Sequence, residues 1–172
     1  MALLQKYRDV FAWTYDEMPS LDPGLVVHSL NVDPRVKLVV QLARVFHTEV
    51  EAQIIQEIKK LLTTGFIKPI QQPKWLSNIV PMKKKNGQIR CCVDFHNLNK
   101  ACPKDEFPLP NINLLVDSAA GSSMFSFMDG YSRYNQIRIA AKDEEKTAFR
   151  TPIRNFYYTV MPFGLKNAGA TY

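Results

Sequence analysis

The sequence places a single carboxylate at the end of an apolar run. Phe125-Ser126-Phe127-Met128 precedes Asp129, and a run of this kind is typical of a buried strand. A buried carboxylate is costly to desolvate unless it meets a cation or a metal ion, and carboxylate oxygens are the usual ligands of Mg²⁺. Gly130 follows, however, and an aspartate before a glycine is also typical of a turn or a helix cap. Taken alone, the pattern slightly favours a structural aspartate over a metal ligand.

A cluster of cations lies where two β-prone runs meet. Residues 78–84 and 88–94 flank Asn86-Gly87, and an Asn-Gly pair between such runs predicts a tight hairpin. Lys83-Lys84-Lys85 reach the turn and Arg90 lies on the returning strand, so positive charge would gather at the tip. A flexible tip of this kind could hold phosphate groups. The alternative is that these are ordinary lysines in a solvated turn. Taken alone, the cluster favours this alternative over phosphate binding.

Aromatic and polar side chains follow Asp129 closely. Tyr131, Arg133, Tyr134 and Gln136 could stack on a nucleotide and position it beside the carboxylate. Tyr134 could equally pack in the hydrophobic core.

Other titratable side chains are expected to be structural. Asp143-Glu144-Glu145 is typical of a solvated turn, and Asp94 is expected to anchor the loop after its strand. His28, His47 and His96 are scattered without metal-ligand spacing, so we assign them no catalytic role.

The clearest element that must position these residues is a helix beginning near Thr48. Thr48 and Glu51 are spaced as a capping box, in which each side chain bonds the backbone amide of the other residue. Gly65 is placed to end the helix, because glycine readily adopts the left-handed conformation found after a helix C-terminus. One apolar face is predicted from Val50, Ile54, Ile55, Ile58, Leu61 and Leu62.

Short strands are expected through most of the remaining sequence. Residues 66–70 predict an edge strand, because Pro69 has no amide hydrogen for strand pairing. Residues 136–140 predict another strand, with Ile137 and Ile139 on one face. The other expected elements are a short helix opened by Pro110, a buried strand over 124–128, and a hairpin of residues 147–151 and 156–160.

The first part of the chain is expected to be an arm. Apolar side chains at helical spacing predict a short helix over residues 2–12. Pro19, Pro23 and Pro34 follow, so we expect an extended stretch with one short strand over residues 28–32. We therefore interpret residues 1–47 as an N-terminal linker or arm and residues 48–172 as the main domain.

Composition indicates a globular, basic and non-secreted protein. Hydrophobic residues make up 46% of the 172 residues, which excludes disordered and fibrous classes. Lys and Arg outnumber Asp and Glu by 22 to 16, and a net charge of +6 suits a polyanionic partner. The three cysteines, Cys91, Cys92 and Cys102, fit neither a CxxC metal half-site nor a secreted disulfide framework. With no signal peptide or membrane span in the sequence, we expect an intracellular protein of the cytoplasm or nucleus, without a membrane partner.

Several segments, in their order and spacing from about Gly65 onward, resemble the reverse transcriptase of gypsy-like LTR retrotransposons. Each is weakly specific alone, but the series in order is very specific. Residues 7–34 also resemble the linker that precedes this domain in gypsy-type polyproteins. The matching segments are Arg90-Cys91-Cys92-Val93-Asp94-Phe95, Leu98-Asn99-Lys100, Phe107-Pro108-Leu109-Pro110, Phe125-Ser126-Phe127-Met128-Asp129, Tyr134-Asn135-Gln136-Ile137, Lys146-Thr147-Ala148-Phe149 and Met161-Pro162-Phe163-Gly164-Leu165-Lys166-Asn167-Ala168.

The resemblance implies an α+β fold, the fingers and partial palm of an incomplete right-hand polymerase. It implies RNA-directed DNA polymerisation, in which a primer 3′-hydroxyl attacks the α-phosphate of a deoxynucleoside triphosphate (dNTP) on an RNA or DNA template. Two Mg²⁺ ions stabilise the attacking and leaving oxygens in such reactions. Asp129 matches the first catalytic, metal-binding aspartate, and the carbonyl of Gly130 matches a backbone metal ligand.

The resemblance also assigns a nucleotide-binding set. Arg90 matches the fingers arginine that contacts the incoming triphosphate, and Lys84 matches the phosphate-binding lysine. Tyr134 matches the aromatic residue that rejects a ribose 2′-hydroxyl, and Phe163 lies in the segment that lines the nucleotide pocket. The neighbouring cations expected to contact nucleic acid, and alternatives to Lys84, are Lys83 and Lys85.

Two departures from the family limit these expectations. Family members carry two further aspartates on a later hairpin, the YxDD box, and the 172 residues end at Tyr172 before such a box. We therefore predict weak or absent Mg²⁺ binding and no polymerase activity for these residues alone. Arg133 stands where the family usually has a glycine, which predicts an obstructed pocket or a strained backbone.

Two alternatives belong to other functional classes. A non-catalytic remnant would still bind template-primer through its basic hairpin and palm surface, with a steep salt dependence. A pseudogene product would have no role and would fold poorly, because unpaired strand edges promote aggregation.

Overall fold

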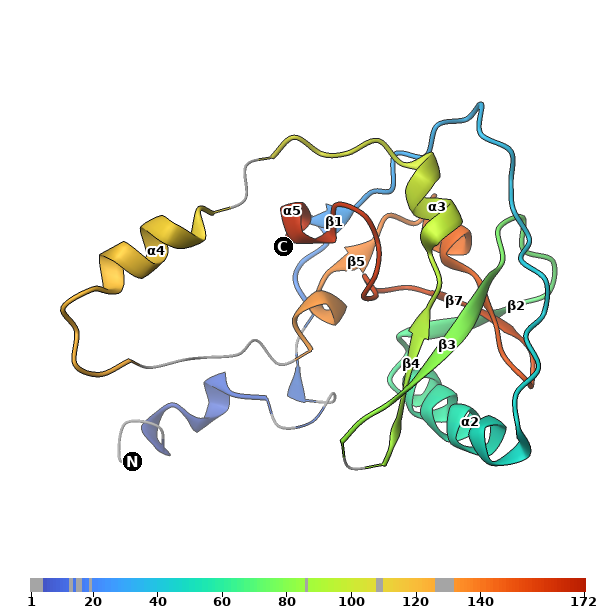
Figure 1. Ribbon diagram of the computed structural model, residues 1–172, viewed down its shortest axis with the longest axis horizontal. Helices are drawn as coiled ribbons and strands as arrows, with labels where there is room; N and C mark the ends of the chain where they lie inside the picture. The colour runs from blue at the N-terminus through green and yellow to red at the C-terminus, as the bar shows by residue number, and fades with distance from the viewer. Residues whose placement is uncertain are drawn as a thin grey trace.

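A five-stranded sheet forms the body of the protein in a computed structural model (Figure 1). The structure describes residues 5–12, 14, 17–18, 20–85, 87–107, 110–125 and 132–172, and of Arg133 only the backbone. Helix α2 (Thr48–Thr63) lies against two strands of this sheet, β2 and β4. The strands, in their order across the sheet, are β2 (Ile67–Ile70), β7 (Asn155–Tyr158), β6 (Phe149–Arg150), β3 (Ser77–Lys83) and β4 (Ile89–Val93).

Both predicted hairpins are confirmed. β3 and β4 pair antiparallel around a turn in which Gly87 has φ +81°. β6 and β7 form the second hairpin, and β6 joins β3 in parallel. β2 is an edge strand, where Pro69 lies opposite Phe156 and its missing amide hydrogen is tolerated. β4 is the opposite edge, which leaves its outer side open to other parts of the chain.

Helix α2 forms as predicted, but the capping box does not. His47, not Thr48, is the N-cap, and it makes no side-chain cap hydrogen bond. The amides of Val50 and Glu51 both bond the carbonyl of His47, so Thr48 already lies inside the first turn and cannot serve as the cap. The C-terminus ends as expected, since Gly65 adopts φ +71°.

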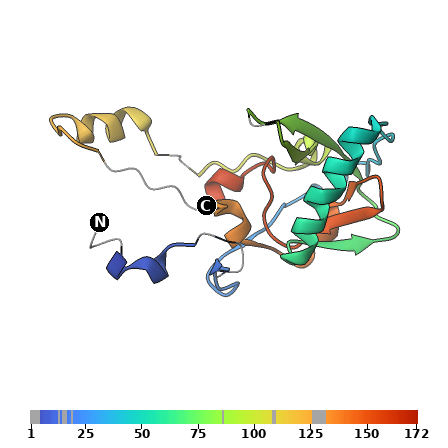
Figure 2. The same ribbon diagram turned by 90° about the horizontal axis from the view of Figure 1, so that it is seen from below.

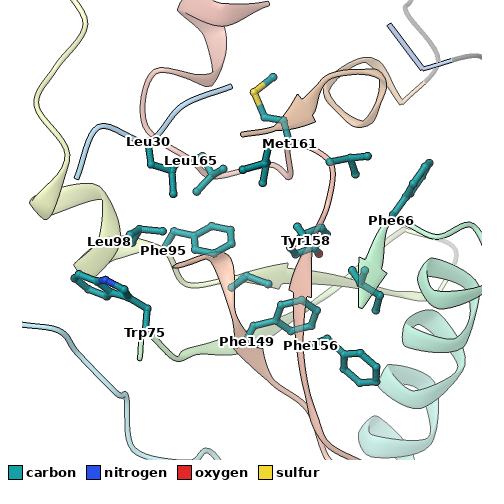
Figure 3. Packing of buried hydrophobic residues seen from close by; sticks show 14 of the residues in the cluster. Leu30, Phe66, Trp75, Phe95, Leu98, Phe149, Phe156, Tyr158, Met161 and Leu165 are labelled. Carbon is teal, nitrogen blue, oxygen red and sulfur yellow. The ribbon is translucent and has the colours of Figure 1, made fainter. Parts of the chain in front are cut away.

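The hydrophobic core lies between α2 and the sheet and continues to the far end of the body. Ile54 and Ile58 of α2 are fully buried in it. Figure 3 shows the rings of Phe149, Phe156 and Tyr158 gathered on adjacent strands, and the Phe149 and Tyr158 centroids are 5.0 Å apart. Ile79 of β3 and Val93 of β4 belong to the same core cluster, so the core ties the two hairpins together.

The N-terminal arm packs onto this body. Its strand β1 (Val27–His28) pairs in parallel with β5 (Arg138–Ile139), and both are shorter than the strands predicted at these positions. Leu30 is 2% exposed and joins the core cluster near Leu165 (Figure 3). The helix expected over residues 2–12 lies partly outside the described residues; within them, Arg8–Val10 form the 3-10 turn η1.

Three further helices are short. α3 (His96–Ala101) follows β4, and α5 (Ala168–Thr171) lies against β1. α4 (Ile112–Ala119) is capped by the side chain of Asn111 and has no buried residue. It stands away from the body in both views (Figures 1 and 2). None of the helices in the described part is long and apolar enough to cross a lipid bilayer.

The strand expected over residues 124–128 is not seen where the structure describes this segment. Met124 and Phe125 lie outside any strand, and Met124 is 87% exposed. Residues 126–128 lie outside the described residues.

Candidate functional site

Arg90 and Phe163 are in direct contact across the open edge of the sheet. Arg90 is an exposed residue of β4, and Phe163 lies in the loop that follows β7. The guanidinium carbon lies 4.8 Å from the centroid of the Phe163 ring. Such a cation–π contact contributes about 0.5–1 kcal/mol at an exposed position. The side chain of Arg90 has no hydrogen-bond or ion-pair partner in the described part of the chain, so its N–H groups are available for an anion.

Tyr134 extends this contact into an aromatic row. It lies in the 3-10 turn η3 (Arg133–Gln136), and its ring meets Phe163 edge-on at a centroid distance of 4.8 Å. Tyr172 also packs edge-on against Tyr134, at a centroid distance of 5.6 Å. We call Arg90, Phe163, Tyr134 and Tyr172 the aromatic row. Three of its members were predicted at the nucleotide site, whereas no sequence pattern indicated Tyr172.

Tyr134 packs against the core, as one of its two interpretations predicted, and its contact with a nucleotide stays a prediction. Its side chain is half-buried and packs against the core cluster, yet it also contacts exposed Phe163. It therefore lies at the border between the core and the surface, where one ring face can be structural and an edge can meet a ligand.

A small cavity of about 110 Å³ borders the aromatic row at the edge of β4. Small-molecule pockets are usually larger, about 300–1,000 Å³, so this cavity can take only part of a ligand. A larger cavity of about 660 Å³ lies between the arm and α3 but shares no lining residue with the row. Side chains that line the small cavity include Glu57, Leu61, Arg90, Ser132, Pro162 and Phe163.

The lysines of the hairpin are exposed at its tip. The pairing of β3 with β4 sets Met82 opposite Arg90 and Lys83 opposite Ile89. Lys84 continues the ladder through its amide and is two residues from Met82, so alternation assigns it to the face of Arg90. Lys84 also borders a polar cavity of about 240 Å³ between the hairpin and α2. Its placement on the face of Arg90 rests on strand register, not on a contact between the two side chains.

Asn99 of α3 holds the loop that carries Phe163. Its Nδ2 donates to the carbonyl of Gly164 at 2.7 Å, and its Oδ1 accepts from the amide of Lys166 at 2.8 Å. The Lys166 ammonium donates to the carbonyl of Cys102 at 2.6 Å. Gly164 has φ +94°, a conformation that other residues adopt only with strain. These contacts bring two of the matched sequence segments together.

Asn167 holds the end of the same loop. It adopts φ +66°, and its Nδ2 donates to the carbonyl of Pro103 at 2.9 Å. Its Oδ1 accepts from the amide of Asp105 at 3.0 Å. The loop from Phe163 to Asn167 is thus fixed at both ends by asparagine side chains.

The predicted metal ligands, Asp129 and Gly130, lie outside the described residues. Within the described part, no group of three His, Cys, Asp or Glu side chains is arranged to hold a metal ion. The left-handed conformation in the following turn falls on Ser132, with φ +48°, and Arg133 begins the 3-10 turn. The backbone strain predicted at Arg133 is therefore not found.

Asp143 was predicted in a solvated turn, and that prediction is wrong. Its side chain is 1% exposed and accepts from the amide of Leu30 at 3.0 Å and from the ammonium of Lys146. The arm covers this carboxylate and supplies one of its donors. Asp94, by contrast, anchors the following loop as predicted, since it accepts from the amide of His96 and pairs with Arg44.

The three cysteines, Cys91, Cys92 and Cys102, are free thiols. Burial, with a smaller contribution from nearby Glu57, raises the pKa of Cys91 to about 12. Burial also raises the pKa of Cys102. Because of these raised pKa values, Cys91 and Cys102 stay protonated at neutral pH. They are therefore suited to packing and not to nucleophilic chemistry, which needs the thiolate.

The chain matches a protein family described as reverse transcriptase (RNA-dependent DNA polymerase) over residues 82–172. It is 35% identical over 134 residues to the retrovirus-related Pol polyprotein from transposon opus of Drosophila melanogaster, covering 74% of this chain and 13% of that polyprotein. It is 42% identical over 87 residues to the transposon Tf2-3 polyprotein of Schizosaccharomyces pombe, covering 51% of this chain and 6% of that polyprotein. The chain therefore spans a small part of these relatives.

Solved structures share the fold. A foamy viral protease-reverse transcriptase in complex with dsDNA matches 98% of this chain and 33% of that chain, with a TM-score of 0.72 and 19% identity. The prototype foamy virus protease-reverse transcriptase CSH mutant matches 97% and 22%, with a TM-score of 0.66 and 16% identity. The α+β fold predicted from the sequence, the fingers and partial palm of a polymerase, is thereby confirmed.

Proposed function

Because the chain belongs to the reverse transcriptase family, we propose that it is the nucleotide-binding part of an RNA-directed DNA polymerase. We assign it to a gypsy-like LTR retrotransposon polyprotein, with residues 1–47 as an arm and residues 48–172 as fingers and partial palm. The observation that supports this proposal is the convergence of Arg90, Phe163 and Tyr134 from distant segments.

Arg90 would bind the triphosphate of an incoming dNTP. Its guanidinium carbon lies over the Phe163 ring, and the exposed guanidinium can donate paired hydrogen bonds to phosphate oxygens. Lys84, on the same strand face, would add a second positive charge from the hairpin. A hairpin that can bend would bring this charge onto the phosphates after the nucleotide enters.

Tyr134 and Phe163 would contact the sugar and base of the dNTP. Phe163 is 48% exposed, so it offers an apolar face to a ligand. Tyr134 packs against both Phe163 and Tyr172, and these two contacts restrict the movement of its ring. A rigid ring at this place would exclude a ribose 2′-hydroxyl by steric contact.

Asp129 and the carbonyl of Gly130 would hold Mg²⁺. Divalent ions bound there would stabilise charge on the attacking and leaving oxygens. One carboxylate and one carbonyl are too few ligands for a firm Mg²⁺ site, since the ion prefers six oxygens. We propose that the 172-residue polypeptide by itself binds the metal weakly and does not polymerise.

Lys83 and Lys85 would contact the phosphates of an RNA or DNA template-primer. Both are exposed, and the chain has a net charge of +6. The same exposed lysines and net positive charge support a second candidate function, template-primer binding without synthesis.

The free thiols fit a reducing compartment inside the cell.

Nucleotide binding is tested with labelled dTTP, Mg²⁺ and a hairpin template-primer. We expect Arg90→Ala to weaken dTTP retention at least tenfold, while Arg154→Ala, at an exposed arginine in the β6–β7 turn, leaves it unchanged. Equal retention by both variants would contradict the assignment of Arg90. Template-primer binding without any dTTP retention would favour the second function.

A further inference from the structure

One contact between the arm and the helix next to the aromatic row is made by a buried histidine. His28 of β1 is 1% exposed and lies opposite Ile139 of β5. Its Nδ1 lies 2.8 Å from Oγ1 of Thr171 in α5, a residue 143 positions later in the chain. The arm is thus bonded to the helix that leads directly into Tyr172.

The geometry around Thr171 gives the direction of this hydrogen bond. Its hydroxyl also lies 3.3 Å from the carbonyl of Asn167, which can only accept. In the assignment that satisfies both contacts, the hydroxyl donates to Asn167 and accepts from Nδ1–H of His28. This tautomer leaves Nε2 of His28 as a buried acceptor with no partner in the described part of the chain. An unpaired buried acceptor destabilises the fold. The hydrogen bond from Nδ1–H to Thr171 offsets part of this cost.

Two routes connect the arm to Tyr134. In the first, His28 fixes Thr171, and the next residue, Tyr172, packs edge-on against Tyr134 at 5.6 Å. In the second, the amide of Leu21 donates to the carbonyl of Gln136 at 2.9 Å, at the end of the turn that carries Tyr134. The arm therefore contacts both the turn that carries Tyr134 and the helix that leads into Tyr172.

We propose that His28 is a positioning residue of the nucleotide site, which fixes α5 so that Tyr172 holds Tyr134 against Phe163. The proposal rests on the assignment of Tyr134 and Phe163 to dNTP binding. It makes the arm a working part of the polymerase site and not a passive linker. His28 itself touches no substrate and acts through the aromatic row.

The experiment uses ¹⁹F NMR of the 172-residue chain labelled with 3-fluorotyrosine. The chain has seven tyrosines, and Tyr134→Phe and Tyr172→Phe assign the two resonances that matter. His28→Leu introduces an apolar side chain of similar size and removes the N–H donor. His28→Asn keeps an N–H donor near the position of Nδ1. Thr171→Val removes the acceptor from the other side of the same bond.

A matched control is available in Thr159. Its buried hydroxyl bonds the carbonyl of Gly65, so Thr159→Val removes a threonine hydrogen bond away from the aromatic row. We expect His28→Leu and Thr171→Val to move the resonances of Tyr134 and Tyr172, His28→Asn to restore them, and Thr159→Val to leave them in place. If His28→Leu fails to fold, Thr171→Val decides. Unchanged Tyr134 and Tyr172 resonances in folded Thr171→Val would overturn the proposal.

Addition of dTTP with Mg²⁺ and template-primer separates this proposal from the function on which it rests. If Tyr134 is at the dNTP site, its resonance shifts in the wild type and shifts less in Thr171→Val at equal dTTP. If dTTP shifts nothing in the wild type, the proposed nucleotide site fails, and His28 loses its role there even if the ligand-free spectra show the coupling. A full dTTP response in Thr171→Val would remove His28 from positioning while leaving the nucleotide site intact.

Discussion

Asn99 donates a hydrogen bond from its amide nitrogen to the carbonyl of Gly164, 65 residues later, at 2.7 Å. Its amide oxygen accepts from Lys166 in the same loop. One side chain thus satisfies two backbone groups of a turn whose glycine has φ +94°. Phe163 precedes that glycine, so the orientation of the ring that contacts Arg90 depends on α3.

Replacing Asn99 with alanine should therefore weaken both the fold and the site. Loss of two partly exposed hydrogen bonds predicts a decrease of about 1–2 kcal/mol in the free energy of unfolding, measured by urea denaturation. Asn97→Ala in the same helix is the control. Retention of dTTP should fall in Asn99→Ala at temperatures where the chain is still folded. Wild-type stability and retention in Asn99→Ala would show that the loop does not depend on this clasp.

Protonation of His28 should make folding dependent on pH. Burial lowers the pKa of His28 from its ordinary value of 6.5, and nearby Asp143 opposes this only in part. Below about pH 6.5 the unfolded chain then binds more protons than the folded chain. The free energy of unfolding is therefore highest above that pH and decreases as the pH falls. Urea midpoints between pH 7.5 and 5 should show this decrease in the wild type. His28→Asn should show a smaller decrease.

A steeper pH dependence in His28→Asn than in the wild type would contradict this account of His28. The variant has no imidazole at residue 28, so it cannot take up the proton that destabilises the wild-type fold.

Short-range patterns predicted the elements whose causes lie within a few residues. Asn86-Gly87 predicted the β3–β4 hairpin, and Pro69 predicted an edge strand, because turn conformation and a missing amide act locally. Gly65 marked the end of α2 for the same reason.

Features that depend on distant segments could not be predicted in this way. Asp143 looked solvated because its neighbours are charged, yet Leu30, 113 residues earlier, covers it and donates to it. Tyr172 was missed because its role depends on contact with Tyr134 and on the bond from His28 to Thr171. No local pattern records contacts of this range.

The hairpin lysines should determine the salt dependence of nucleic-acid binding. Each phosphate contact contributes about 0.9 to the slope of log K against log salt for duplex DNA. Changing Lys83, Lys84 and Lys85 to alanine should therefore reduce the slope by about 2–3, measured by fluorescence anisotropy with a labelled template-primer. Lys142→Ala, an exposed lysine outside the hairpin, is the control. An unchanged slope in the triple variant would exclude the hairpin from the binding surface.

The 172-residue polypeptide should not extend a primer. Asp129 alone supplies too few metal ligands for a two-metal reaction. Incorporation of labelled dTTP on a primed template with Mg²⁺ should equal that of Asp129→Asn. Template-dependent synthesis that Asp129→Asn abolishes would show that these residues contain a complete catalytic site.

The most direct test of the central claim is to map where a nucleotide lies. A photoreactive dTTP analogue, 4-thio-dTTP, is irradiated with the chain, template-primer and Mg²⁺, and the cross-linked residues are identified by mass spectrometry. The aromatic row predicts cross-links at Tyr134 or Phe163 that unlabelled dTTP displaces and Arg90→Ala reduces. Displaceable cross-links confined to another surface, such as the cavity between the arm and α3, would contradict the assignment of the nucleotide site.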